Sequence, residues 1–263
     1  MASARTHKVI RGIAIAVIII CVIALVLIFS IYRTQSSYYE QLAEDAAPDL
    51  EQSAAAAANS TNDLAAMSVD WDSLRAQNPD IVAWIIVPGT VIDYPVVKSE
   101  DNNDYLHRSF SGSTGVWASA GTIFMDCNNS ADLTDRNIAF YGHHMRDGSM
   151  FARFADFSSQ SVFDEHRTIY VLTPTMNYRL TTFACVLTTG TDLIVQTEFA
   201  SNDDYEAYIQ DKLERSVVSQ GSDSLTASEI GRSFMFSTCE YSQKNGRAVV
   251  YAAVRDSAAP SNG

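Results

Sequence analysis

The most pronounced pattern in the chain is an apolar run near its N-terminus. Residues 12–32 read GIAIAVIIICVIALVLIFSIY and contain no charged side chain. A helix needs roughly 20 apolar residues to cross the hydrocarbon core of a bilayer. Basic residues precede the run, whereas acidic residues accumulate from Glu40 onward. By the positive-inside tendency, we expect residues 1–11 to stay in the cytoplasm and the rest of the chain to be exported.

A cleaved signal peptide is the alternative interpretation of this run. The run is longer than the apolar core of a usual signal peptide, and no clear small-x-small cleavage site follows it directly. We therefore expect residues 12–32 to be an uncleaved signal-anchor. The expected localisation is the cell membrane, with a single span, a cytoplasmic N-terminus and an extracellular domain.

The pattern changes after the apolar run. Residues 33–68 are rich in Ala, Ser, Asn, Gln, Asp and Glu, and their centre, QSAAAAANSTN at 52–62, has almost nothing to bury. This composition predicts an extracytoplasmic stalk that is partly helical.

From residue 69 onward, short β-rich runs alternate with turn residues such as Pro88-Gly89. The runs are AWIIV (83–87), VIDYPVV (91–97), GTIFM (121–125), NIAFY (137–141), TIYVL (168–172), YRLTTFACVLTT (178–189), SFMFSTC (233–239) and RAVVYAAVR (247–255). Eight short strands separated by turn signals predict a mainly β domain that forms a closed or nearly closed barrel. We place this domain at 69–257 and a disordered tail at 258–263.

A few helices are expected to flank the strands. One short helix lies in VDWDSLRAQNPD and ends at Asn78-Pro79, and another covers 101–110. A longer helix at 203–218, capped by Asn202, has apolar residues at three- and four-residue spacing. These residues are Tyr205, Tyr208, Ile209, Leu213 and Val217. We interpret this stripe as core packing against the barrel and not as a ligand site.

Charge and cysteine content narrow the possible functions. The formal net charge of −13 disfavours nucleic acid as a partner, because phosphate binding needs a basic surface. Of the four cysteines, one lies in the apolar run, and Cys127, Cys185 and Cys239 follow it. An odd number outside the membrane leaves at least one thiol unpaired within the chain. Cys185, in the apolar stretch FACVL, fits a buried inert thiol, so a reactive thiol is sought elsewhere.

Three segments carry groups that suit catalysis. The sequence FYGHHMRDGSMF leaves a strand at Gly142 with two imidazoles, Cys239 ends an apolar strand, and Arg247 opens the last strand. Alternation along 233–239 places Ser237 and Cys239 on one face of the strand. If the residues between Cys239 and Arg247 form a hairpin loop, these two side chains lie opposite each other and point the same way.

Each residue type has a chemical reason to be in such a set. A thiol becomes a strong nucleophile as a thiolate, which a nearby cation favours. A histidine can supply that charge and later protonate a leaving amine. An arginine keeps its charge and can hold an oxyanion or a substrate carbonyl. The paired histidines could also be half of a metal site, but no matched Cys/His/Asp spacing completes one, so we expect no metal.

In these motifs the chain resembles the sortases, and specifically the class B sortases. The carrying residues are Ser237-Thr238-Cys239 at a strand end, Arg247 opening the next strand, and Tyr141-Gly142-His143. The stretches 78–97, 101–110 and 121–126 and the helix at 203–218 also look like class B segments. The resemblance covers about 69–255.

The resemblance implies a sortase-type eight-stranded β-barrel and a cysteine transpeptidase. Cys239 would attack the carbonyl after a threonine in a C-terminal sorting signal and form a thioester, which an amine then resolves. His143 would be the general acid/base, with His144 as its main rival, and Arg247 the oxyanion or substrate clamp. Substrate contacts would come from Ser237, Thr238, Tyr141 and Glu240. No cofactor is implied.

The implied partners are surface proteins with a sorting signal of the Asn-Pro-x-Thr or Pro-x-Thr-Gly type. The acceptor would be a peptidoglycan precursor amine or a pilin lysine, and the role haem-uptake protein anchoring or pilin linkage. Two residues depart from the family pattern: Phe236 stands before Ser-Thr-Cys where many relatives carry Leu, and Cys127 follows Asp126 where we expect no thiol.

Two other functions compete with this interpretation. One is an extracytoplasmic cysteine peptidase or hydrolase of a different fold. Papain-like enzymes place cysteine before histidine, and the caspase Q-A-C-x-G signature is absent from the sequence, so both are disfavoured. The other is a non-catalytic surface module, for which replacement of Cys239 would have no effect.

Overall fold

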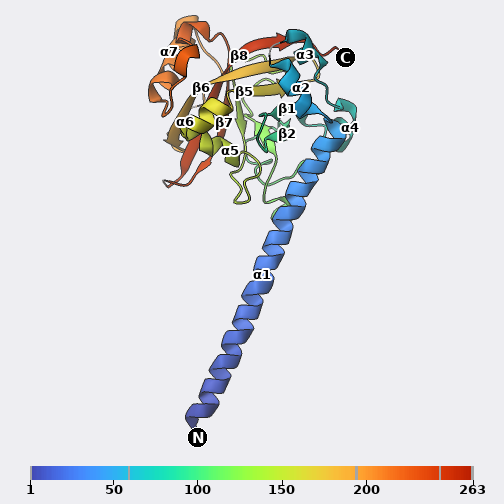
Figure 1. The fold of residues 1–263 in the computed structure, drawn as a ribbon, viewed down its shortest axis with the longest axis vertical. Helices are drawn as coiled ribbons and strands as arrows, with labels where there is room; N and C mark the ends of the chain where they lie inside the picture. Colours follow the sequence, from blue (N-terminus) through green and yellow to red (C-terminus); the bar gives the residue numbers. More distant parts are fainter. Residues whose placement is uncertain (1, 59, 193–194, 243, 262–263) are drawn as a thin grey trace.

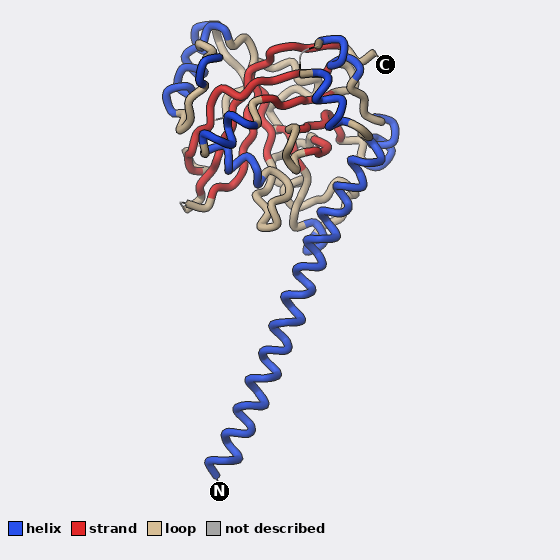
Figure 2. The backbone as a smooth tube through the Cα atoms, in the orientation of Figure 1, coloured by secondary structure: helices blue, strands red, loops and turns tan. Residues whose placement is uncertain are grey.

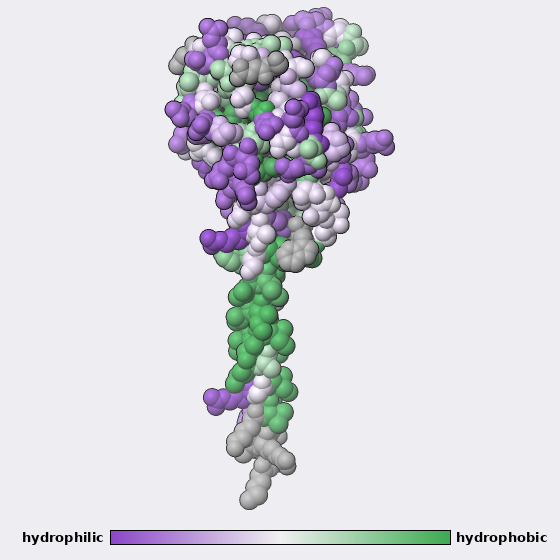
Figure 3. Space-filling view, turned by 90° about the vertical axis from the view of Figure 1, so that its right-hand side faces the viewer, coloured by the Kyte–Doolittle hydropathy of each residue, from purple (hydrophilic) through white to green (hydrophobic). Residues whose placement is uncertain are grey.

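A long helix, α1 (Ala2–Ala46), projects from a body built of strands (Figure 1). The computed structural model describes residues 2–58, 60–192, 195–242 and 244–261. Within α1, the segment Val9–Ala46 has a window of mean hydropathy 3.4 with 0% of that window buried, so it is a candidate membrane span. Figure 3 shows its apolar side chains as a continuous column that leads to the mostly polar surface of the body.

The strands form a closed barrel, as the sequence predicted, and their order is β1-β2-β3-β4-β7-β8-β6-β5. Figure 2 shows the strands gathered in the body at the end of α1, with the shorter helices around them. They are β1 (Ile81–Ile86), β2 (Asp93–Val97), β3 (Ile123–Met125), β4 (Asn137–Tyr141), β5 (Thr168–Leu172), β6 (Asn177–Thr189), β7 (Ser233–Glu240) and β8 (Gly246–Ala258). β4 and β5 match their predicted bounds, and the other strands differ from theirs by a few residues at one or both ends.

Alternation along β7 divides its side chains between two apolar clusters. Phe234 and Phe236 are fully buried in the main core, where Phe236 stacks on Phe154 with ring centroids 5.0 Å apart. Met235 belongs to a second cluster that includes Val249 of β8 and residues of α7. Ser237 and Cys239 continue the face of Met235, because successive strand residues point to opposite sides.

The remaining helices are short, apart from α7. They are α2 (Leu50–Ala57), α3 (Thr61–Ala66), α4 (Trp71–Gln77), α5 (Ala152–Ala155), α6 (Gln160–Glu165) and α7 (Asn202–Arg215), with 3₁₀ turns η1 (Gly115–Ala118), η2 (Asp156–Ser158), η3 (Gly221–Asp223) and η4 (Ala227–Glu229). α4 ends at Gln77 with Asn78 as its C-cap, as expected.

α7 packs against the barrel much as its apolar stripe predicted. Tyr205, Tyr208 and Ile209 are buried under it. Its cap differs from the prediction, because Ser201 rather than Asn202 accepts a hydrogen bond from the Asp204 N–H at 3.1 Å. Val217 lies outside the helix and is 50% exposed, so it takes no part in the stripe.

The predicted helix at 101–110 is wrong. The structure has turns there, and the Asp101 carboxylate accepts hydrogen bonds from the N–H groups of Asn103 and Asp104 at 2.8 and 2.9 Å. Such side-chain bonds compete with helical backbone bonds. The segment nevertheless buries Tyr105 and Phe110 fully, so it is folded firmly onto the barrel.

Residues 33–68 are partly helical, as expected, but the prediction that 52–62 has almost nothing to bury is wrong. Ala54 and Ala57 of α2 are 1% and 0% exposed, and the Tyr170 hydroxyl donates to the Ala54 carbonyl at 2.8 Å. The small alanine side chains let α2 approach the barrel closely. Asn177 of β6 donates from one amide to the carbonyls of Leu64 and Met67, both at 2.9 Å, and so fixes the end of α3.

The C-terminal part of α1 also packs on the body. Tyr39 and Leu42 are buried, and the Tyr39 hydroxyl donates to the Gly121 carbonyl at 2.6 Å. Nearer the apolar run, the Gln35 amide oxygen accepts from the Ala120 N–H at 2.8 Å. α1 is therefore one uninterrupted helix from the apolar run to the barrel.

The end of the chain lies beside α3 (Figure 1). Within the tail expected to be disordered, Ser261 donates from its N–H to the Ala65 carbonyl at 2.8 Å. Residues 262–263 of that tail lie outside the described residues.

Candidate functional site

Cys239 lies near the end of β7, directly opposite Arg247 of β8. The antiparallel register of the two strands pairs Cys239 with Arg247, as the sequence predicted. Directly opposed residues of an antiparallel pair point to the same face. A half-exposed thiol and a guanidinium therefore share one edge of the barrel.

Parallel pairing of β4 with β7 brings the histidines to the same edge. Tyr141 is in register with Ser237, and the next residue, Gly142, donates from its N–H to the Ser237 carbonyl at 3.2 Å. The chain then continues alongside Cys239, whose carbonyl oxygen lies 2.7 Å from Nδ1 of His144. Two strands nearly 100 residues apart in sequence thus converge on the thiol.

Gly142 is needed for this path. A Cβ atom at this position would lie 2.5 Å from Cδ1 of Ile123 and 2.7 Å from Cγ of Phe151. Only glycine lets the chain leave β4 between these two buried side chains. The turn that delivers the histidines therefore depends on the absence of a side chain.

His143 is held by the segment that replaces the predicted helix at 101–110. Its Nε2 lies 2.7 Å from the carbonyl oxygen of Leu106. Because a carbonyl oxygen only accepts, Nε2 carries the proton and Nδ1 is the free basic nitrogen in the neutral ring. Burial lowers the pKa of His143, the Leu106 carbonyl opposes that shift, and the nearby His107 lowers the pKa further.

His144 has a different set of contacts. Its Nδ1 is engaged by the Cys239 carbonyl, and its ring packs against Tyr241 with centroids 4.7 Å apart. The Tyr241 hydroxyl donates to the His144 carbonyl at 2.9 Å. Burial raises the pKa of Tyr241, Cys239 raises it further, and Arg146 and Arg247 lower it. Tyr241 therefore lies within electrostatic reach of the thiol.

Tyr141 is anchored from behind by a buried acid. Its hydroxyl donates to Asp126 at 2.7 Å, and the Asn102 amide donates to the same carboxylate oxygen at 3.0 Å. Burial, reinforced by Asp126, raises the pKa of Tyr141, so this phenol stays protonated. Asn102 also accepts from the Cys127 N–H at 2.8 Å, which ties the backbone of Cys127 into the network.

The other expected site residues differ in their placement. Ser237 is 3% exposed and shares the face of Cys239, whereas Thr238 is 2% exposed and belongs to the opposite face. Glu240 accepts from the Ser242 N–H and hydroxyl at 2.7 and 2.6 Å, so its carboxylate is used within the hairpin loop. Arg247 donates to the carbonyl of Gly246 at 2.9 Å.

Sequence reasoning missed Tyr241, Asp126, Asn102 and the Leu106 carbonyl. Asn102, Leu106 and Asp126 lie in stretches that carry the family resemblance, but residue type alone does not single them out. Tyr241 lies in a hairpin loop, where the sequence gives no periodic signal. Cys185 agrees with its prediction, since it is fully buried and burial raises its pKa to about 12.

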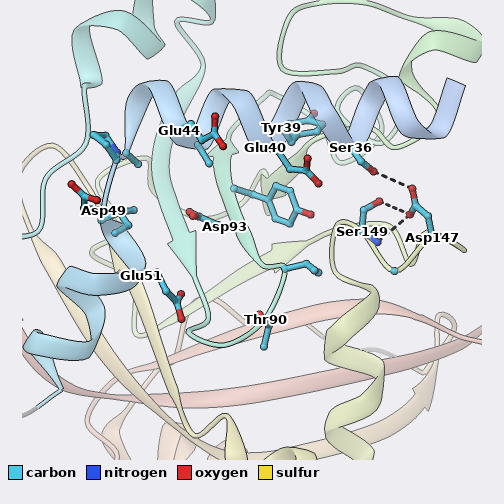
Figure 4. Close-up of a pocket in the computed structure, with 17 residues that line it drawn as sticks. Ser36, Tyr39, Glu40, Glu44, Asp49, Glu51, Thr90, Asp93, Asp147 and Ser149 are labelled. Carbon is cyan, nitrogen blue, oxygen red and sulfur yellow. Dashed lines mark hydrogen bonds between the residues drawn. The ribbon is translucent and has the colours of Figure 1, made fainter. Parts of the chain in front are cut away.

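Two cavities lie near this edge of the barrel. A pocket of about 900 Å³ is bordered by His144 and Tyr241. A second pocket, of about 580 Å³, lies between α1 and β2 and has an acidic lining that includes Glu40, Glu44 and Asp93 (Figure 4). Cys239 does not line this second pocket, so we do not assign the chemistry to it.

Comparison with known proteins agrees with the geometry. A family model described as a sortase domain matches residues 85–255. Sortase B of Listeria monocytogenes is 34% identical over 179 residues, which covers 67% of this chain and 70% of that protein. Sortase B of Staphylococcus aureus is 32% identical over 186 residues, with 70% and 74% covered.

Solved structures give the same result. The crystal structure of Staphylococcus aureus sortase B aligns with a TM-score of 0.68 at 28% identity, over 84% of this chain and 98% of that one. Clostridium perfringens sortase B aligns with a TM-score of 0.65 at 32% identity, over 70% and 99%. The chain therefore belongs to the sortase family, and the relatives that it matches are class B sortases.

Proposed function

We propose that this protein cleaves a C-terminal sorting signal after threonine and transfers the new carboxyl end to an amine, with Cys239 as nucleophile. The pairing of Cys239 with Arg247, at the edge where β4 delivers two histidines, carries this proposal. Family membership makes the enzyme a cysteine transpeptidase. The closed barrel together with the sortase family match argues against a cysteine hydrolase of another fold.

His143 is the better candidate for the general acid/base. It follows the end of β4, where Tyr141 pairs with Ser237, and its hydrogen bond to Leu106 leaves Nδ1 free for proton exchange. Nδ1 of His144 is already engaged by the Cys239 carbonyl, and its ring is covered by Tyr241. We therefore assign His144 a positioning role.

The reaction proceeds in two balanced steps. His143 takes the thiol proton of Cys239 as Sγ attacks the carbonyl carbon of the threonine, the C–N bond that follows this carbonyl breaks, and His143 passes the proton to the leaving amine. An acceptor amine then attacks the thioester, the C–S bond breaks, and His143 takes the proton from the attacking nitrogen and returns it to Sγ. Arg247 stabilises the oxyanion that forms in each step.

The donor peptide binds on the face of Cys239, beside Ser237 and Tyr141. Ser237 offers a hydroxyl, and Tyr141 lines the groove with its ring while Asp126 holds its hydroxyl. Thr238 and Glu240 act indirectly in this proposal, by shaping β7 and the hairpin loop. The sorting signal is of the Asn-Pro-x-Thr or Pro-x-Thr-Gly type, carried by surface proteins.

The acceptor is a peptidoglycan precursor amine or a pilin lysine, which corresponds to anchoring or to pilin linkage. α1 holds the enzyme in the cell membrane, with residues 1–11 in the cytoplasm and the barrel outside. The exposed apolar length of α1 supports this arrangement.

The test uses the full chain in detergent with fluorogenic peptides of both motif types. Cys239→Ala should abolish cleavage and the thioester mass adduct, whereas Cys127→Ala, a second half-exposed thiol, should leave both intact. Circular dichroism should show the same fold in all three proteins. Full activity of Cys239→Ala would overturn the proposal and favour a non-catalytic role for this thiol.

A further inference from the structure

The pocket of about 900 Å³ that His144 and Tyr241 border has no role in the cleavage step described above. Its walls come from the β1–β2 turn (Gly89, Thr90 and Val91), the loop after β4, α5 and Tyr241. We call it the side pocket. A volume of this size suits a ligand of several residues or a small conjugate, because ligand sites typically measure about 300–1,000 Å³.

The side pocket shares a wall with the reaction centre. His144 and Tyr241 line the pocket, and His144 also contacts the backbone of Cys239 through its 2.7 Å bond. A ligand in the side pocket is therefore separated from the Cys239 backbone by a single imidazole. Tyr241, which packs on the His144 ring, is 68% exposed.

The donor peptide leaves this side of the thiol free. Ser237 and Cys239 share the face of Met235, which packs in the cluster under α7. None of Tyr141, Ser237 and Cys239 lines the side pocket, which instead adjoins the β1–β2 turn and α5. Since the acylated enzyme still holds the donor, an acceptor amine needs a separate approach, and the side pocket provides one.

The charge of the side pocket indicates what it binds. In a chain of net charge −13, its lining holds two arginines, Arg146 and Arg153, and one acid, Asp156. Arg153 pairs with Asp156 at 2.9 Å. Arg146 is exposed and forms no ion pair within the part of the chain that the structure describes. An unpaired guanidinium in a pocket suits a carboxylate or phosphate group.

The neighbouring acidic pocket favours the binding of an anion at Arg146 rather than in that pocket. It shares Thr90, Val91 and Gly148 with the side pocket and presents Glu40, Glu44 and other carboxylates from α1 and β2 (Figure 4). An anionic group is repelled there and attracted at Arg146. The two pockets therefore adjoin through shared residues, but the charges of their linings are opposite in sign.

We infer that the side pocket binds the acceptor substrate, a peptide that carries both the attacking amine and a carboxylate, with Arg146 holding the carboxylate. This inference rests on the proposed function, because it concerns the second step of that reaction. It assigns the two substrates to opposite sides of His144, the donor beside Ser237 and the acceptor beside Arg146.

The experiment measures transfer and hydrolysis of a sorting peptide in the presence of defined amines. The probes are Gly-Gly-Gly and Nα-acetyl-lysine, each as free acid and as carboxamide, with products quantified by mass spectrometry. The wild type should prefer the free acids. Arg146→Ala should lower kcat/KM for the better free acid about 10-fold, leave the carboxamide rate unchanged and so remove the preference, as expected for loss of a charged hydrogen bond.

A second variant tests the pocket independently of charge. Val91→Trp places an indole at a 56% exposed position of the lining and should lower transfer to all four amines at least 5-fold. Arg75→Ala on α4 and Val217→Trp are the matched surface controls and should behave as wild type. Urea unfolding verifies that each variant is folded.

The outcomes separate the two proposals. If Arg146→Ala and Val91→Trp transfer as the wild type does, or if the wild type cleaves but shows no acid preference, the inference is overturned and the proposed function stands. If the wild type cleaves no sorting peptide, the proposed function fails and the inference falls with it.

Discussion

Replacement of Arg247 tests the part of the mechanism that depends most directly on the β7–β8 register. Arg247→Ala removes the guanidinium that this register places opposite Cys239, while the thiol and both histidines remain. Loss of one oxyanion donor typically costs ~10²–10³ in rate, or about 2.7–4 kcal/mol of transition-state stabilisation. Acylation and deacylation each form an oxyanion, so both should slow.

The structure predicts that this loss is separable from folding. Arg247 is half-exposed, and its guanidinium donates to the carbonyls of Gly246 and Asn245 within its own hairpin. Removal of such a side chain typically changes the free energy of unfolding by about 0.5–1 kcal/mol. The catalytic effect should therefore exceed the effect on stability by several-fold.

The assay compares kcat/KM for peptide cleavage with the single-turnover rate of thioester formation, and urea unfolding gives the stability. Arg255→Ala is the matched control, because it removes an exposed arginine from the same strand. Arg247→Lys keeps the charge but not the planar fork and should fall between wild type and Arg247→Ala. A loss below about fivefold in Arg247→Ala, or an unfolding change as large as the kinetic change, would refute the reasoning.

Three further predictions follow from buried or titrating groups. Phe236→Ala should lower the free energy of unfolding by about 3–5 kcal/mol in urea, since Phe236 is fully buried; a change below about 1 kcal/mol would contradict the packing described. His107→Ala removes a group that lowers the pKa of His143, so the alkaline limb of the kcat/KM profile should move to higher pH, and an unmoved or lower limb would argue against His143 as the acid. Burial raises the pKa of Asp93 from 3.8 to about 6, so its stabilising contribution is complete below pH 4 and is lost as the pH rises through 6. Asp93→Asn, which keeps an acceptor for the Trp84 N–H, should flatten Tm between pH 4 and 6 and raise stability at pH 7 by up to about 3 kcal/mol; an unchanged slope would refute this.

Much of the barrel could be predicted because strand periodicity is local. The runs at 137–141 and 168–172 match β4 and β5, and alternation along 233–239 assigned Phe236 and Cys239 to opposite faces. The hairpin register of Cys239 with Arg247 also followed from the sequence, because the two strands are joined by a short loop.

Predictions failed where distant segments decide the structure. A short helix was expected at 101–110, but the Asp101 carboxylate accepts from backbone N–H groups and the barrel buries Tyr105. Ala54 is buried, and its carbonyl accepts from the Tyr170 hydroxyl, which lies more than 100 residues away in the sequence. Composition alone gives no reason to expect the alanines of α2 to be buried. The structure shows that their small side chains let α2 pack closely against the barrel.

The site was predicted less completely than the fold. The roles proposed for Cys239, His143 and Arg247 came from residue type and resemblance. The structure adds the contacts that hold these side chains in place. Neither the Leu106 carbonyl nor Asp126 has a signal in the sequence, because each acts through a contact between segments that periodicity does not relate.

The unbroken course of α1 has a mechanical consequence. A flexible linker of 36 residues would have a root-mean-square end-to-end distance of about 30–36 Å, so the domain could move over that range. Here Gln35 already contacts the body only three residues after the apolar run, a rise of about 4.5 Å along the helix, and Tyr39 and Leu42 lock the helix against rotation. With α1 spanning a bilayer, the barrel would lie at a fixed distance from the membrane surface and would tilt over a narrow range. Substrates would then be selected partly by the distance of their reactive groups from the membrane.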